Sequence, residues 1–126
     1  MFVRRMLLIC SLATALFPVA EACADQIHFK ITSLNSKPVR IDFHGVTFSH
    51  RWPAKVGDSW RIPDADEVNI SLSCSEAEYL CYGAWQEDNK TVFWGNGFNR
   101  EHRCASCCYN CDGGTYEITL QDPGAE

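Results

Sequence analysis

Six cysteines dominate the chemistry available to the second half of this chain. They are Cys74, Cys81, Cys104, Cys107, Cys108 and Cys111, and the last four spell CxxCCxxC. Cysteine sulfur has three common uses in proteins: it pairs in disulfides, it binds soft metal ions as thiolate, and it exchanges disulfides with a substrate. The spacing alone fits all three uses, so other features of the sequence must decide among them.

Disulfide bonds are the use that we favour for all six cysteines, because the N-terminus has the pattern of a secretory signal and exported chains meet an oxidising environment. The pairing stays open at this stage. Cys74 and Cys81 flank a predicted turn and could bridge each other, or each could reach into the CxxCCxxC cluster. The neighbours Cys107 and Cys108 are expected to have different partners, because a bond between adjacent cysteines strains the short ring.

Metal binding through the cluster is the main alternative. The thiolates of Cys104, Cys107, Cys108 and Cys111 would suit tetrahedral zinc or a soft ion such as Cu(I). The two CxxC motifs abut, however, which leaves little chain to wrap around one ion, and an oxidising compartment competes for the thiols. A redox role is weaker still, because redox CxxC motifs normally open a helix and these lie in a predicted loop. We therefore expect no cofactor.

Aromatic side chains are the second candidate chemistry. In the predicted strand 79–85, alternation places Tyr82 and Trp85 on opposite faces, so one of them should lie outside the core. Tyr82, Trp85 and Trp94 are the candidate ligand-binding residues, because exposed aromatic rings stack on sugars and anchor protein partners. The alternative is that the tryptophans are core residues and cross-strand pairs.

Motifs for catalysis or nucleotide binding are not found in the sequence. It contains no GxSxG, HExxH, P-loop or GxGxxG pattern, and no nucleophile, base and orienting group come together, so we expect a protein that is not an enzyme. The four histidines, His28, His44, His50 and His102, are scattered, and we expect them on the surface. The net charge of −5, without a Lys/Arg cluster, argues against nucleic acid as a partner.

The N-terminal segment 1–24 is predicted to be a signal peptide. Arg4 and Arg5 precede a mostly apolar run, 6–17, that is shorter than the roughly 20 residues of a membrane span. We expect cleavage after Ala24, which leaves the domain 25–126 with an even six cysteines and no membrane-spanning segment, secreted or in a periplasm. Lipidation at Cys23 is the alternative, although Glu21 makes a poor lipobox.

The remaining chain has the pattern of an all-β domain. Apolar residues alternate with polar ones in 27–31, 39–43, 68–74 and 116–120, and turn-forming residues separate these segments. The first two are expected to form a hairpin. About seven short strands without a helical period predict a small antiparallel β-sandwich or barrel that disulfides hold together.

The order of these motifs resembles a group of small exported cysteine-rich bacterial proteins. The matching segments are 70–74, 80–85, 94–97 and 104–111, which fit the pattern LSC…CYGAW…WGxG…CxxCCYxC over about the last half of the chain. The resemblance implies an exported bacterial β-domain. The group has no established activity, so the resemblance assigns no role to any residue.

From these observations we expect a non-enzymatic, exported binding domain that recognises a protein partner through loops or an aromatic face. The partner would be an envelope protein, or the domain would have an inhibitor or immunity role. A carbohydrate-binding module and a thiolate metal protein are the alternatives.

Overall fold

The computed structural model describes residues 26–63 and 65–122. The predicted signal peptide, its cleavage site after Ala24 and the alternative lipidation at Cys23 lie outside these residues. Within the described residues, no helix has the length and apolar character needed to cross a bilayer.

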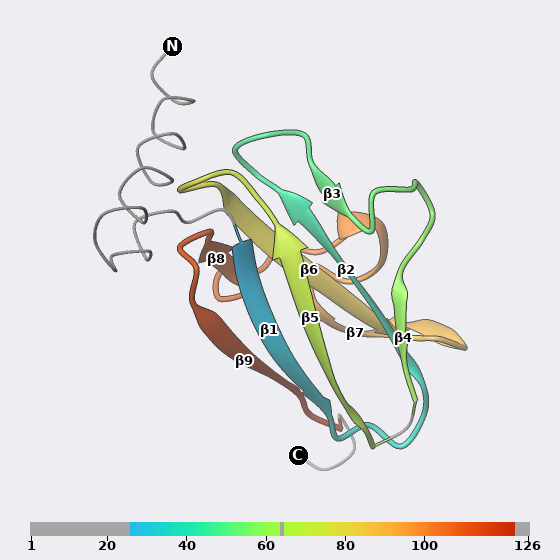
Figure 1. Cartoon of the computed structure of the whole chain (residues 1–126). Coiled ribbons are helices and arrows are strands. Elements are labelled where there is room, and N and C mark those ends of the chain that lie inside the picture. Colours follow the sequence, from blue (N-terminus) through green and yellow to red (C-terminus); the bar gives the residue numbers. More distant parts are fainter. Residues whose placement is uncertain (1–25, 64, 123–126) are drawn as a thin grey trace.

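Nine strands and one short 3-10 helix make up the described part of the chain (Figure 1). They are β1 (Gln26–Ser33), β2 (Val39–Gly45), β3 (Arg51–Trp52), β4 (Trp60–Ile62), β5 (Glu67–Ser73), β6 (Tyr79–Gln86), β7 (Asn89–Gly95), the helix η2 (Phe98–Arg100), β8 (Cys108–Asn110) and β9 (Thr115–Leu120). The predicted all-β class is confirmed. The strands that were not expected as separate elements are the very short ones, such as β3 and β8.

Two sheets stack in the manner of a sandwich (Figure 1). The smaller sheet has the order β5-β1-β9, in which β1 is antiparallel to β5 and parallel to β9. The larger sheet has the order β3-β2-β6-β7, with β4 also paired to β2 and β8 also paired to β6. All pairings of the larger sheet are antiparallel.

The hairpin expected between the first two strands is wrong, because β1 and β2 belong to different sheets. Both strands bury one apolar face, and these faces meet each other across the sandwich. The rings of Phe29 and Phe43 stack with their centroids 4.7 Å apart. Asn35 holds the crossing segment, since its side-chain amide donates to the carbonyl of Lys37 at 2.9 Å and to the side chain of Gln86 at 3.2 Å.

The core lies between the two sheets and contains the inward residues of the alternating strands. Its buried members are Ile27, Phe29, Ile31, Val39, Ile41, Phe43, Ile62, Ile70, Leu72, Leu80, Ala84, Ile118 and Leu120. Because period-two alternation selects one face of each strand, the opposite face of the larger sheet carries a different set of side chains. That outer face is where the candidate site lies.

The segment 96–107 crosses the outer face of the larger sheet and covers part of it. Glycine makes this approach possible, because a side chain at Gly83 would collide with the carbonyl oxygen of Gly97. Trp85 then packs edge-on against Phe98 of η2, with ring centroids 5.1 Å apart. Lys90 extends its ammonium over the other ring of this pair, 4.5 Å from the centroid of Phe98.

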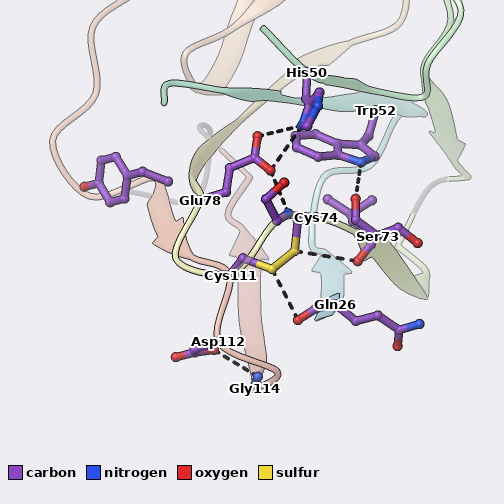
Figure 2. Close-up of a disulfide and its surroundings, with 12 residues drawn as sticks. Gln26, His50, Trp52, Ser73, Cys74, Glu78, Cys111, Asp112 and Gly114 are labelled. Atoms are coloured by element: carbon purple, nitrogen blue, oxygen red, sulfur yellow. Dashed lines mark hydrogen bonds and ion pairs between the residues drawn. A yellow bond between two sulfur atoms is a disulfide. The ribbon is translucent and has the colours of Figure 1, made fainter. Parts of the chain in front are cut away.

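Three disulfides connect the described cysteines: Cys74–Cys111, Cys81–Cys108 and Cys104–Cys107. Cys74 and Cys81 therefore both reach into the cluster, and the predicted separation of partners for Cys107 and Cys108 is confirmed. The bond Cys74–Cys111 joins the end of β5 to the chain after β8, so it ties the smaller sheet to the larger (Figure 2). It closes 37 residues of sequence, a loop for which chain entropy predicts a stabilisation of roughly 4 kcal/mol.

Candidate functional site

A cavity of about 570 Å³ lies on the outer face of the larger sheet, beside the segment 96–107. Its polar side chains come from two arginines, two histidines and one asparagine, namely His44, Asn96, Arg100, His102 and Arg103. No acidic residue lines this cavity among the described residues. This basic composition contrasts with the whole chain, whose net charge is −5.

The elements around the cavity are set by the alternation of β2 and β6. His44 follows the inward Phe43, so it points to the outer face, directly opposite Cys81 of β6. The covering segment is closed by two bonds between Asn96 and His102: the side-chain amide of Asn96 donates to the carbonyl of His102 at 2.7 Å, and the amide of His102 donates to the carbonyl of Asn96 at 3.0 Å. His102 also stacks flat on Phe93, with ring centroids 3.7 Å apart.

The charged groups that line or adjoin the cavity perturb each other. Burial lowers the pKa of His44 from 6.5 to about 4, and the positive charges of Arg100 and Arg51 add to this, against hydrogen bonding to Asn96. Burial also raises the pKa of Asp42 from 3.8 to about 6, although Arg51 and Arg100 oppose it. Within the described chain, His44 Nδ1 is buried and has no hydrogen-bond partner. At neutral pH, His44 is therefore an uncharged ring inside a positive potential.

Arg51 and Arg100 differ in how their charges are balanced. Arg51 lies 3.6 Å from a carboxylate oxygen of Asp42. Arg100 and Arg103 form no ion pair with any acidic residue in the described ranges. These two guanidinium groups form no ion pair in the described ranges, although the charge of Arg100 also acts on Asp42, and their position next to the cavity suits it to an anionic group.

The rest of the cavity wall is apolar. Val46 and Ala105 line it, together with Cys104 and the disulfide between Cys81 and Cys108. The cavity therefore combines a cationic side with a hydrophobic one, which is the combination expected for an amphipathic group rather than a bare ion.

Sulfur atoms of the cluster gather in a way that the sequence did not indicate. The Sγ atoms of Cys81, Cys107 and Cys108 lie within 4.8 Å of one another. Cys111, which belonged to the predicted four-thiolate set, is bonded to Cys74 instead. All three gathered sulfurs are also in disulfides, and it is the thiolate that binds soft metals, so this arrangement serves as a covalent staple.

The predicted aromatic residues do not share one face. Trp94 lies opposite Ala84 in the β6–β7 ladder and packs, partly buried, against the core. Its indole Nε1 donates to the carbonyl of Gln121 at 2.8 Å at the surface. Tyr82 also packs against the core, and burial raises its pKa to about 12. Trp85 is on the outer face but only 6% exposed, because Phe98 covers it.

Exposed apolar side chains gather instead at the loop between β2 and β3. Val46 is 59% exposed, Phe48 is 47% exposed and, at the start of β6, Tyr79 is 39% exposed. The backbones of these segments are joined, since the amide of Val46 donates to the carbonyl of Tyr79 at 2.7 Å and the amide of Tyr79 donates to Thr47 Oγ1 at 3.1 Å. Sequence alternation could not find this group, because only the loop between the strands brings it together.

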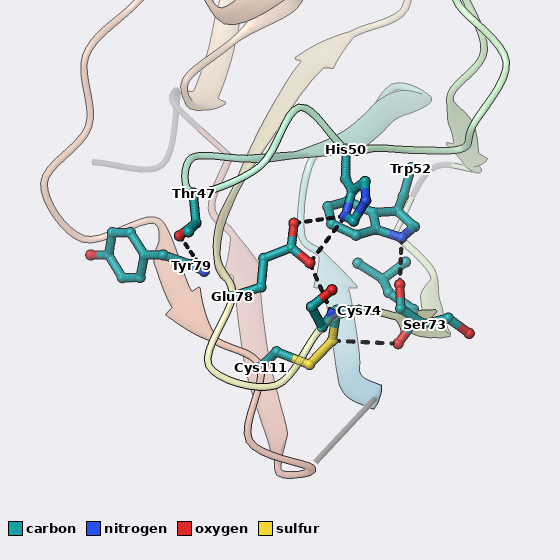
Figure 3. A network of polar contacts seen from close by, with 10 residues as sticks. Thr47, His50, Trp52, Ser73, Cys74, Glu78, Tyr79 and Cys111 are labelled. Carbon is teal, nitrogen blue, oxygen red and sulfur yellow. Dashed lines mark hydrogen bonds and ion pairs between the residues drawn. A yellow bond between two sulfur atoms is a disulfide. The ribbon is translucent and has the colours of Figure 1, made fainter. Parts of the chain in front are cut away.

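A buried carboxylate fixes that loop (Figure 3). The side chain of Glu78 is fully buried, and its oxygens lie 2.9 and 3.1 Å from His50 Nδ1. It also accepts a hydrogen bond from the amide of Ser75 at 2.9 Å. Gly45 is needed beside it, because a Cβ there would come within 2.6 Å of the carboxylate. The Glu78 side chain thus connects the 45–50 loop to the turn that precedes β6.

His44 is the cavity residue that sequence reasoning placed least well. Alternation correctly turns it away from the core, but the segment that covers it is far away in sequence. The glycines Gly83, Gly95 and Gly97 were the available signal, because closely spaced glycines in strands mark close approach of another backbone. No family model, no curated protein and no solved structure matches this chain, so its function must be inferred from its own residues and their geometry.

Proposed function

We propose that this chain is an exported binding domain that recognises a protein partner through its β2–β3 loop, Tyr79 and the segment 100–105. We call this area the loop surface. The observation that carries the proposal is the exposure of Val46, Phe48 and Tyr79 at a surface that also holds Arg100 and Arg103. Neither arginine forms an ion pair within the described residues. The partner expected from this chemistry presents an apolar anchor next to acidic groups.

Hydrogen bonds from buried and neighbouring residues hold the loop surface in one conformation, which suits a binding role. The buried Glu78 holds His50, and Thr47 accepts the amide of Tyr79, so the loop carrying Phe48 is tied at several points. A loop that is already ordered loses less conformational entropy when a partner binds. The three disulfides add to this rigidity, and they fit an oxidising compartment outside the cytoplasm.

A protein partner is preferred over a glycan for a specific reason. Sugar binding was expected to use Tyr82, Trp85 and Trp94, but two of these pack against the core and the third is covered by Phe98. Among the described residues, the large aromatic rings that are more than a third exposed are those of Phe48 and Tyr79, and both lie in the loop surface.

Selection from a random peptide display library tests the proposal. The disulfide-bonded protein is the bait, and we expect the selected peptides to converge on an apolar residue next to Asp or Glu. Phe48→Ser and Tyr79→Ser should each weaken the binding of the selected peptides at least tenfold, because each substitution removes an apolar side chain that anchors the peptide.

The matched control is Val56→Ser, which removes an apolar side chain that is 83% exposed in a different loop. It should leave peptide binding unchanged. Peptides that fail to converge, or that bind the Phe48→Ser and Tyr79→Ser variants as tightly as the original protein, would contradict the proposal.

A further inference from the structure

The cavity beside the loop surface has the chemistry of a specific subsite. Arg100 and Arg103 approach it from the covering segment, and within the described chain neither has an ion pair with a carboxylate. His102 is fixed by Asn96 and by stacking on Phe93, so it forms a rigid part of the same wall. These side chains offer positive charge and hydrogen-bond donors to an anion.

The apolar part of the cavity wall indicates which class of anion would fit. Val46, Ala105 and the Cys81–Cys108 disulfide would contact aliphatic groups, whereas a small inorganic ion would leave this part of the cavity unused. The planar guanidinium groups match the two oxygens of a carboxylate. In a protein, the group that combines an aliphatic stem with a carboxylate end is the side chain of glutamate or aspartate.

We infer that this cavity binds the carboxylate of a glutamate or aspartate side chain, with Arg100 and Arg103 as the cationic side, His102 as their polar neighbour and Val46 as the apolar side. The inference rests on the proposed function, in which the same group belongs to the protein partner. It names the residue type that the partner places next to its apolar anchor.

The pKa of His44 can report whether a carboxylate is bound in the cavity. The charged groups facing it are Asp42 on its own strand, Arg51 on β3 and Arg100 on η2, and His102 and Arg103 line the same cavity. Arg51 and Arg100 help to hold the pKa of His44 at about 4. A bound carboxylate would offset these charges, so the pKa of His44 should rise on binding.

Titration with glutarate, a dicarboxylate with an aliphatic stem, tests the cavity without the partner. The imidazole resonances of His44 are followed by NMR at constant ionic strength, in the disulfide-bonded protein. We expect a saturable shift with a dissociation constant of about a millimolar, as suits so small a ligand. Arg100→Gln and Arg103→Gln should each weaken binding at least fivefold, and the pKa of His44 in the original protein should rise with glutarate.

The matched control is Arg61→Gln, which removes an arginine that pairs with Glu87 and does not line the cavity. It should bind glutarate as the original protein does. Inorganic phosphate at equal ionic strength separates the two classes of anion. Phosphate binding more tightly than glutarate, a linear shift without saturation, or unchanged affinity in both cavity variants would each overturn the inference.

The peptide selection and the glutarate titration can each fail without the other, so their outcomes distinguish the proposed function from the carboxylate site. If the selected peptides depend on Phe48 and Tyr79 but glutarate gives no saturable shift, the proposed function stands and the carboxylate site is refuted. Glutarate binding without any convergent peptide would keep the carboxylate site and remove the protein partner.

Discussion

Asp42 and His44 are predicted to make opposite contributions to the pH dependence of stability, and single substitutions should separate them. Asp42 has a folded pKa raised from 3.8 to about 6. Its contribution to stability is therefore complete below the ordinary pKa and is lost as the pH rises through 6. His44 has a folded pKa lowered from 6.5 to about 4, so its contribution is present above the ordinary pKa and is lost as the pH falls through 4. In the original protein the two slopes nearly cancel.

The size of each contribution follows from the shifts. A pKa difference of one corresponds to about 1.4 kcal/mol, so each full shift corresponds to about 3 kcal/mol. The side chain of Asp42 is only 15% exposed, but both groups lie near an open cavity, where water screens their charges. We therefore expect about 1–2 kcal/mol from each group across the interval from pH 4 to pH 6.5.

The assay is urea unfolding of Asp42→Asn, His44→Asn and the original protein at several pH values between 4 and 7, with the disulfides intact. Asp42→Asn should gain about 1–2 kcal/mol in stability, relative to the original protein, as the pH rises, because only the His44 contribution remains. His44→Asn should lose about as much over the same interval.

Other titrating groups should not confuse this comparison. Hydrogen bonds from Arg61 and from Tyr116 lower the pKa values of Glu87 and Asp112, respectively, and both carboxylates are present in all three proteins. Their contributions cancel in the differences between proteins. Parallel stability curves for the three proteins, or slopes of the opposite sign, would refute the assignment of these two shifts to burial in the site.

Three further changes should act on the fold. Glu78→Ala removes the buried acceptor of two hydrogen bonds, so we expect a loss of about 2–4 kcal/mol in urea unfolding; a loss below about 0.5 kcal/mol would contradict the anchoring role. Gly83→Ala places a methyl group against the carbonyl of Gly97 and should cost about 1–3 kcal/mol, whereas an unchanged midpoint would mean that the covering segment does not touch β6 there. Replacing Cys74 and Cys111 together with serine should cost roughly 4 kcal/mol, and peptide mapping of the original protein should recover this pair as one linked species; recovery of any other pairing would contradict the structure.

Strands were predictable from the sequence where one face is buried along the whole element. The alternation of Ile27, Phe29 and Ile31 and that of Val39, Ile41 and Phe43 both appear as inward faces of observed strands. What alternation does not contain is the identity of the neighbour. A strand with one apolar face can meet another in the same sheet or across a core, and here the second arrangement occurs.

The candidate site was less predictable because it depends on contacts between distant segments. Alternation predicted that Tyr82 and Trp85 lie on opposite faces of their strand, but it does not say which face packs against the other sheet. In the structure, the face that carries Tyr82 packs against the core. The cavity exists because the segment 96–107 crosses the outer face, and the three disulfides help to hold that crossing. Cysteine spacing leaves the pairing open, so neither the covered state of His44 nor the grouping of Arg100 with Arg103 could be derived beforehand.

The position of β1 has a consequence for when the domain can fold. It is the first described strand and the central strand of its sheet, yet its neighbours β5 and β9 come much later, and β9 is the last described strand. During synthesis, β1 is therefore without its neighbour β5 until residues 67–73 have emerged, and without β9 until residues 115–120 have emerged. Contacts this distant in sequence slow folding. Such delayed assembly leaves an apolar strand open to aggregation until β9 pairs with it.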